Sequence, residues 1–168
     1  LNFDHKQLLY ASVNVSPKFG IFRPTWGFNY NQQFFDTRKY GASKALSRPL
    51  LSCSLNNNFA LSETMNAAIR LNAATPNADG FLMRKSNYSV DLRFDKSFAN
   101  RTWIIYLSAN DIFKTTKERW TMYGLGAGTT KDCYNYTRNI SLQVTYNFNA
   151  KRSKYKGTGA GNEEKSRL

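Results

Sequence analysis

The chain has 168 residues, enough for one domain with a substantial core, and 15% of them are aromatic although the mean hydropathy is −0.57. Lys and Arg number 24 against 11 Asp and Glu, giving a net charge of +13, but the excess gathers in connections and at the C-terminus, where charge runs are usually solvated. No apolar run of about 20 residues predicts a membrane-spanning helix. Two cysteines and one histidine are too few for a zinc site or a disulfide framework. The chain does not begin with Met and has no signal peptide, so we expect it to be part of a longer protein.

The first three predicted elements are strands near residues 7–15, 20–34 and 50–60, because apolar and polar side chains alternate along each of them. Successive side chains of a strand point to opposite faces, so each segment has one apolar and one polar face. In residues 22–30, for example, Phe22, Pro24, Trp26, Phe28 and Tyr30 alternate with Arg23, Thr25, Gly27 and Asn29.

The same alternation predicts four further strands near residues 64–75, 87–96, 101–111 and 138–148. In the last of these, Ile140, Leu142 and Val144 alternate with Ser141, Gln143 and Thr145. No apolar stripe with a period of 3.6 residues is sustained anywhere, so we expect no helix longer than two turns.

Strand length and the chemistry of the polar faces favour a membrane barrel over a soluble sheet. Each predicted segment has nine residues or more, whereas strands in soluble sheets average about 5–6 and a tilted strand needs about 9–11 to cross a bilayer. Charged side chains occupy strand centres, and aromatic residues such as Phe94 and Phe98 gather towards strand ends, as they do at membrane interfaces. We therefore predict an all-β fold, an antiparallel transmembrane β-barrel with its apolar face against outer-membrane lipid and its polar face towards a lumen.

Short and long connections alternate strictly along the chain. The short ones are 16–20, 61–63 and 96–100, and the long ones are 36–49, 76–86 and 111–137. Outer-membrane barrels have short periplasmic turns, long extracellular loops and, in bacteria, an even number of strands. Seven predicted strands therefore indicate the C-terminal portion of a larger barrel, residues 1–148, followed by a basic, flexible periplasmic tail, residues 149–168.

Segments near the C-terminus resemble those of a known family. The stretch "SANDIFKTTKERWTMYG" (108–124) is similar to the "NLFDxxY" segment that opens the last extracellular loop of TonB-dependent receptors, with Ile112 and Phe113 at the Leu-Phe positions and Lys114 where Asp is usual. "TRNISLQVTYNF" resembles their closing strand, with Phe148 as the barrel-closing aromatic residue. With the tail and the motifs "KSF" and "NDIF", these segments more closely resemble the subgroup called the outer membrane protein β-barrel family. The specific motifs lie in about the last 75 residues.

The resemblance implies a transporter in the outer membrane of a Gram-negative bacterium. Such a protein has a barrel of about 22 strands, an N-terminal plug domain and an energy supply from the TonB system, and takes up a nutrient such as a siderophore, a glycan or a peptide. This chain would supply part of the wall and three extracellular loops. Its partners would be lipid, the plug, the remaining strands, the TonB system and a surface lipoprotein or other subunits. A non-transporting barrel that acts as a scaffold or subunit of a surface complex remains the alternative.

Alternation assigns a set of side chains to each face of the wall. Those expected to face the lumen are Arg23, Asn29, Asn56, Arg70, Asn72, Asp91, Arg93, Asn110 and Gln143, and those expected to face lipid include Trp26, Leu55, Ile69, Leu92, Leu107 and Leu142. Lumen residues can contact substrate, although pairing with the plug and hydration are commoner roles. Trp120 and Tyr123 in the last loop are candidates to stack a ligand, although aromatic residues are also common at membrane interfaces. We expect no cofactor and no metal.

Two other functional classes fit the sequence less well. An enzyme needs a nucleophile, a base and usually an acid within reach, but the one imidazole, His5, precedes the first strand, so we expect no catalytic role. A nucleic-acid-binding sheet would place aromatic and basic side chains on one face. Here they alternate to opposite faces, so we expect no nucleic-acid partner.

Overall fold

The structure, a computed structural model, describes residues 6–34, 36–42, 46–124 and 127–148. These residues form eleven strands and one 3-10 turn, Thr37–Tyr40. None of them forms a helix long and apolar enough to cross a bilayer. The predicted all-β class is confirmed, whereas the expected tail at 149–168 and His5 lie outside the described residues.

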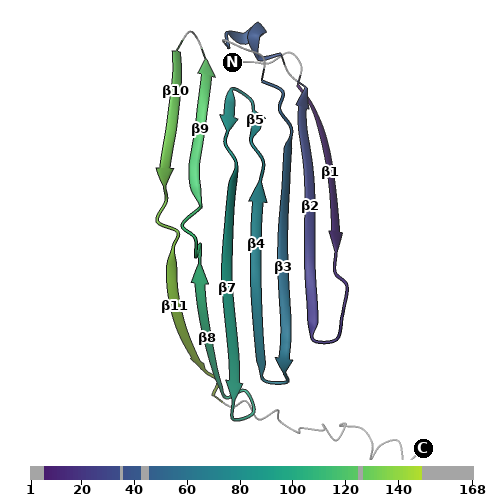
Figure 1. Cartoon of the computed structure of the whole chain (residues 1–168), viewed down its shortest axis with the longest axis vertical. Coiled ribbons are helices and arrows are strands. Elements are labelled where there is room, and N and C mark those ends of the chain that lie inside the picture. Colours follow the sequence, from purple (N-terminus) through teal and green to yellow (C-terminus); the bar gives the residue numbers. More distant parts are fainter. Residues whose placement is uncertain (1–5, 35, 43–45, 125–126, 149–168) are drawn as a thin grey trace, which may run out of the picture.

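Seven long strands form one antiparallel sheet in which each strand pairs with its neighbours along the order β1-β2-β3-β4-β7-β8-β11 (Figure 1). Their bounds are β1 (Gln7–Val15), β2 (Phe22–Phe34), β3 (Leu50–Ser62), β4 (Met65–Ala74), β7 (Asn87–Phe98), β8 (Trp103–Asn110) and β11 (Asn139–Tyr146). Every boundary lies within two residues of the sequence prediction. The sheet is open, with β1 and β11 at its edges among the described residues, so the closed barrel of about 22 strands stays a prediction.

The two kinds of connection gather at opposite ends of the sheet. The short turns lie at the lower end in Figure 1 and the long connections lie at the upper end. The backbone of the turn between β7 and β8 is unusual, because Ala99, Asn100 and Arg101 all have positive φ angles, of 48°, 54° and 69°. Only glycine adopts that backbone conformation without cost, so this turn is strained.

Two of the long connections fold into a second antiparallel sheet of order β10-β9-β6-β5, which corrects the sequence prediction of loops at 76–86 and 111–137. Its strands are β5 (Asn77–Asp79), β6 (Leu82–Arg84), β9 (Lys117–Gly124) and β10 (Ala127–Tyr134). Alternation of apolar and polar residues is weak in these strands. The pair Asp79-Gly80 is nevertheless a hairpin signal, and Gly80 supplies the positive φ of 57° at this turn.

The second sheet extends the wall without a change of register between β4 and β7. Ala74 pairs with Asn87 in the large sheet, and Asn77 pairs with Arg84 in the small one, so the two hairpin arms advance by the same number of residues. Between β8 and β9 the chain instead bends through Asp111, whose φ is 46°. The upper part of the structure therefore continues the strands of the wall rather than covering them.

Cross-strand pairing places the two sets of predicted side chains on opposite faces. Paired residues share a face, and every second residue of a strand returns to it. One row joins Trp26, Leu55, Leu71 and Val90 across β2, β3, β4 and β7. The next row, one residue along, joins Thr25, Asn56, Arg70 and Asp91. Apolar and polar rows thus belong to different faces throughout the seven strands.

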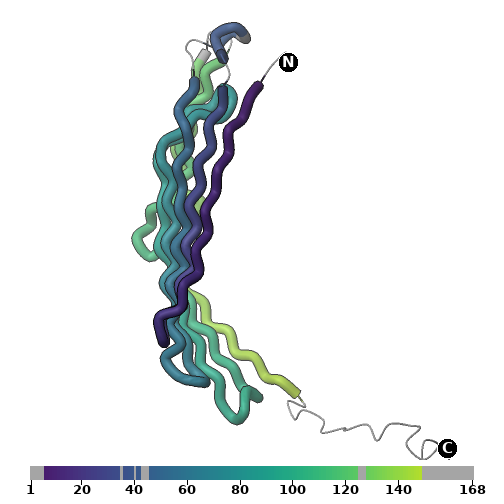
Figure 2. Tube along the Cα trace, turned by 90° about the vertical axis from the view of Figure 1, so that its right-hand side faces the viewer, coloured from purple at the N-terminus to yellow at the C-terminus, as the bar shows by residue number. Residues whose placement is uncertain are grey.

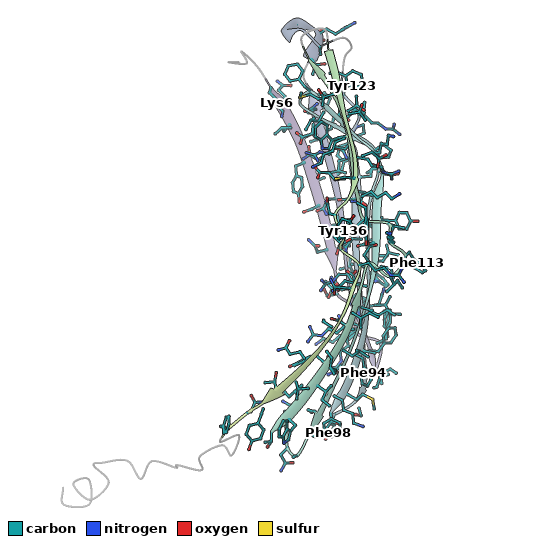
Figure 3. All side chains as sticks on the ribbon, turned by 90° about the vertical axis from the view of Figure 1, so that its left-hand side faces the viewer. Lys6, Phe94, Phe98, Phe113, Tyr123 and Tyr136 are labelled. Carbon is teal, nitrogen blue, oxygen red and sulfur yellow. The ribbon has the colours of Figure 1, made fainter. Side chains whose placement is uncertain are left out.

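The sheet is bowed, and its polar face is the concave one (Figures 2 and 3). A hollow of about 830 Å³ on the polar face is lined from β2 through β11, which requires the wall to curl towards that side. Phe94 and Phe113 project from the opposite, convex side in Figure 3. This is the curvature of a barrel wall with its polar face inside.

The apolar face has no protein packed against it. Among the described residues, the buried apolar side chains are Ala42 and Leu46, in the first long connection, and Pro24 on β2. Val13, Ile69 and Leu142 on the apolar face are 59%, 42% and 67% exposed. A continuous exposed apolar surface of this kind marks contact with a membrane or another protein.

Candidate functional site

Hydrogen-bonded polar side chains cross the concave face from strand to strand. Arg70 on β4 donates from Nε to Asn56 Oδ1 on β3 at 2.6 Å, and Asn66 donates to Asp95 on β7 at 2.8 Å. Further pairs are Ser54 with Asn72, Ser108 with Ser141 and Asn110 with Asn139. These bonds tie neighbouring strands together while leaving the face accessible to water.

The hollow on this face is lined by charged groups that are only loosely paired. Three arginines, Arg23, Arg70 and Arg93, face two carboxylates, Asp91 and Asp95. Arg93 Nε lies 3.7 Å from Asp95 Oδ1, and both groups are in contact with solvent. Exposed pairs of this kind contribute about 0–1 kcal/mol. The groups are therefore free to exchange water for another polar partner at little cost.

An aromatic ring also takes part in the hollow, in a role that alternation did not predict. Tyr106 lies on the polar face of β8, opposite Gln143 of β11. The guanidinium of Arg93 lies 5.0 Å from the centre of the Tyr106 ring, a cation–π distance. The hollow thus offers an aromatic surface beside its charges.

The structure brings seven of the nine candidate lumen residues around this hollow. They are Arg23, Asn56, Arg70, Asp91, Arg93, Asn110 and Gln143. Asn29 and Asn72 lie on the same face but further towards the upper end, where Asn29 accepts a bond from the Tyr10 hydroxyl at 3.1 Å. The polar face is therefore one surface with two levels.

Trp120 and Tyr123 both lie on β9, but the structure directs their side chains to opposite faces because they are three residues apart in a strand. Trp120 Nε1 donates to Glu118 Oε1 at 3.0 Å on the outer face. The two rings therefore do not stack one ligand between them.

Aromatic residues gather at the short-turn end of the wall, where Figure 3 labels Phe98. The rings of Trp103 and Tyr146 are 4.4 Å apart, and those of Tyr146 and Phe148 are 4.5 Å apart. β11 ends at Tyr146, two residues earlier than predicted. Beyond it, the Asn147 amide still donates to the carbonyl oxygen of Thr102, which precedes β8. Phe148 is 81% exposed beyond the strand end, in a girdle of the kind found at membrane interfaces.

Comparison with protein-family models matches residues 1–146 to the outer membrane protein beta-barrel family. The chain belongs to this family. Its location is the outer membrane, and its antiparallel strands are those of an outer-membrane wall. Comparisons with curated proteins and with solved structures gave no match.

In this family member, Asp111 organises the start of the last long connection. Asp111 is 2% exposed. Its carboxylate accepts bonds from the Thr137 hydroxyl at 2.6 Å, the Thr115 amide at 2.8 Å and the Thr116 amide at 3.3 Å. Its own amide donates to Asp91 Oδ1 at 2.8 Å. Asp111 therefore joins both ends of the last long connection to the polar face of the outer-membrane wall.

The bonds to Asp111 outweigh the cost of burying its charge. Burial raises the pKa of the Asp111 carboxyl and is the largest single effect. The hydrogen bonds from Thr137, Thr115 and Thr116 together lower the pKa to about 2 from an ordinary value of 3.8. Asp111 is thus a carboxylate at neutral pH, beyond the end of the membrane-spanning strand.

Gln33 links two of the long connections. It is 3% exposed, its Nε2 donates to Leu46 O at 3.2 Å, and its Oε1 accepts a bond from the Gly80 amide at 2.8 Å. Leu46 is fully buried, and its amide donates to Thr37 Oγ1 at 3.1 Å. Gln33 therefore holds the first and second connections together at the top of the wall.

Sequence patterns missed the roles of Asp111 and Gln33. The "NDIF" motif singled out Asp111 as part of a resemblance but gave no partner for its carboxylate. Gln33 is one of many polar residues in an alternating strand, and no local signal distinguishes it. No group of three or more metal-binding side chains occurs within the described ranges.

Proposed function

We propose that this chain is part of the wall of a TonB-dependent transporter, and that its concave polar face lines the route of a nutrient such as a siderophore, a glycan or a peptide. The proposal assigns no catalytic step to the chain and places residues 149–168 in the periplasm. It rests on the resemblance of residues 108–124 to the last-loop segment of such receptors and on the family match.

The observation that carries the proposal most directly is the hydrated hollow on the concave face. A wall that served only as a scaffold needs no charged hollow, whereas a transport route needs polar groups that are weakly paired and able to exchange partners. Arg23, Arg70 and Asp91 meet this description, because no ion pair within the described part of the chain includes them.

The test compares uptake in cells with and without TonB. Strains that carry or lack the full-length gene, each with or without a functional TonB system, are grown on limiting iron, glycan or peptide sources. The proposal is supported if loss of the gene, loss of TonB function and loss of both give the same growth defect. A defect that persists equally in cells without TonB contradicts it and favours a scaffold in a surface complex, with lipoprotein or other subunits recovered by mild detergent extraction.

A further inference from the structure

A second hollow lies above the first, at the extracellular end of the concave face, and we name it the basic vestibule. Its volume is about 590 Å³. Its lining includes five basic residues, Lys6 before β1, Arg84 at the end of β6, Lys85 after it, and Lys117 and Arg119 on β9, against two acidic residues, Asp79 and Glu118. Figure 3 labels Lys6 at this end of the structure. The vestibule thus concentrates positive charge where a solute from outside first meets the wall.

Strand register directs three of these side chains to the same face. The Lys85 amide donates to Arg119 O at 2.9 Å, and the preceding residue, Arg84, pairs with Trp120. Because side chains alternate, Lys85, Lys117 and Arg119 share one face and Arg84 points to the other. The polar-face residue Asn87 accepts a bond from the Lys117 amide at 3.3 Å, which joins that face to the concave one.

The carboxylates at the border of the vestibule are already paired with other cations. Asp79 Oδ2 lies 3.5 Å from Arg84 Nη2, and Glu118 Oε2 lies 2.6 Å from Lys131 Nζ. Asp79, Arg84 and Glu118 themselves line the hollow, so each acidic residue there has a cation beside it. Within the described ranges, Lys6, Lys85 and Lys117 have no ion pair.

Arg119 carries an unused donor. Its Nη2 donates to Ser86 O at 2.7 Å, whereas its Nε is buried without a hydrogen-bond partner. A buried charged donor without a partner costs free energy, and such exceptions are rare in folded proteins.

We propose that the basic vestibule binds an anionic solute, one that presents carboxylate or phosphate oxygens. The inference rests on the proposed function, since it names the class of cargo. A guanidinium takes such oxygens in a planar, directional geometry, and the ammonium groups of Lys85 and Lys117 add charge without a fixed direction. A neutral glycan would not compensate this positive charge.

The test measures binding to the full-length protein purified in detergent. Calorimetric titrations use citrate as the carboxylate probe, inorganic phosphate as the phosphate probe and maltose as the neutral probe, at low and physiological salt. The variant K117Q/R119Q removes two charges from the vestibule. Its matched control, K39Q/K114Q, removes two exposed charges from the long connections outside the vestibule. Heat-dependent migration on gels checks that each barrel is folded.

We expect citrate or phosphate to bind the unaltered protein, with affinity reduced about tenfold or more in K117Q/R119Q and nearly unchanged in K39Q/K114Q. Equal losses in both variants would indicate bulk charge and overturn the proposal. A K117Q/R119Q protein that melts at a lower temperature but binds the anion as before would also overturn it. Lys117 and Arg119 would then pair with groups inside the complete barrel and not with the solute. Absence of binding, or preference for maltose, also overturns it.

Failure of the site and failure of the proposed function give different results. Binding is measured without an energy source. Anion binding together with a growth defect that does not depend on TonB would therefore support the site and contradict TonB-dependent transport. TonB-dependent growth on a neutral nutrient, without anion binding, does the reverse.

Discussion

The seven-stranded sheet and the four-stranded sheet above it are continuous in space, yet different forces hold them. In the large sheet the convex face is apolar and exposed, with Leu142 at 67% exposure, and the strands are stabilised when lipid covers that face. The small sheet has no such face and is fixed by polar contacts around Asp111 and Gln33. Stability in the first region depends on the surroundings, and stability in the second depends on a few buried bonds.

The largest expected effect separates the two faces of the large sheet. Leu142→Arg places a charge on the apolar face of β11 and should lower the free energy of unfolding by about 2–4 kcal/mol, whereas Gln143→Arg, on the polar face, should lower it by little. Urea unfolding of the full-length protein in lipid vesicles measures both. Equal losses at these adjacent positions would show that the apolar face does not contact lipid.

The next effect belongs to the small sheet. Asp111→Asn removes the charge that the three threonines stabilise, and a pKa lowered from 3.8 to about 2 corresponds to about 2 kcal/mol. We expect faster hydrogen exchange in residues 115–137 and little change in β7. Asp132→Asn, an exposed carboxyl on β10, is the matched control. Unfolding of the large sheet by Asp111→Asn would contradict the separation of the two regions.

Acid should weaken the same region without any mutation. Because the pKa of Asp111 is lower in the folded state than its ordinary value of 3.8, its contribution is complete above about pH 4 and is lost as pH falls towards 2. Pepsin cleavage within residues 111–137 should therefore accelerate between pH 4 and pH 2. In Asp111→Asn the cleavage should already be fast at pH 4, and a pH dependence that survives this change would assign the effect to another group.

The smallest expected effect concerns the lower end of the wall. Ala99 has a φ of 48° in the turn between β7 and β8, so Ala99→Gly should stabilise the protein by about 0.5–1 kcal/mol through relief of strain. Asn100→Gly, with a φ of 54° at that position, should give less because Asn tolerates this conformation better. Urea unfolding in vesicles compares the two, and a larger gain at Asn100 would contradict the strain argument.

The contrast between the regions also explains which predictions the sequence supported. Lipid on one side and water on the other impose an alternation on every wall strand, from Trp26 and Leu55 to Leu107 and Leu142, so their boundaries were predicted within two residues. The sequences of β9 and β10, KERWTMYG and AGTTKDCY, carry little such alternation. They were predicted as a loop although they form a paired hairpin.

The sequence by itself determined the seven strands of the large sheet, the order of short and long connections and the two faces, because each depends on residues close together in the chain. Only the tertiary structure decided how Asp111 meets Thr137, how Gln33 meets Gly80, and which cations share the basic vestibule. The first two contacts join residues that are 26 and 47 positions apart in the chain. They depend on strand register and on a bend whose geometry local patterns do not encode.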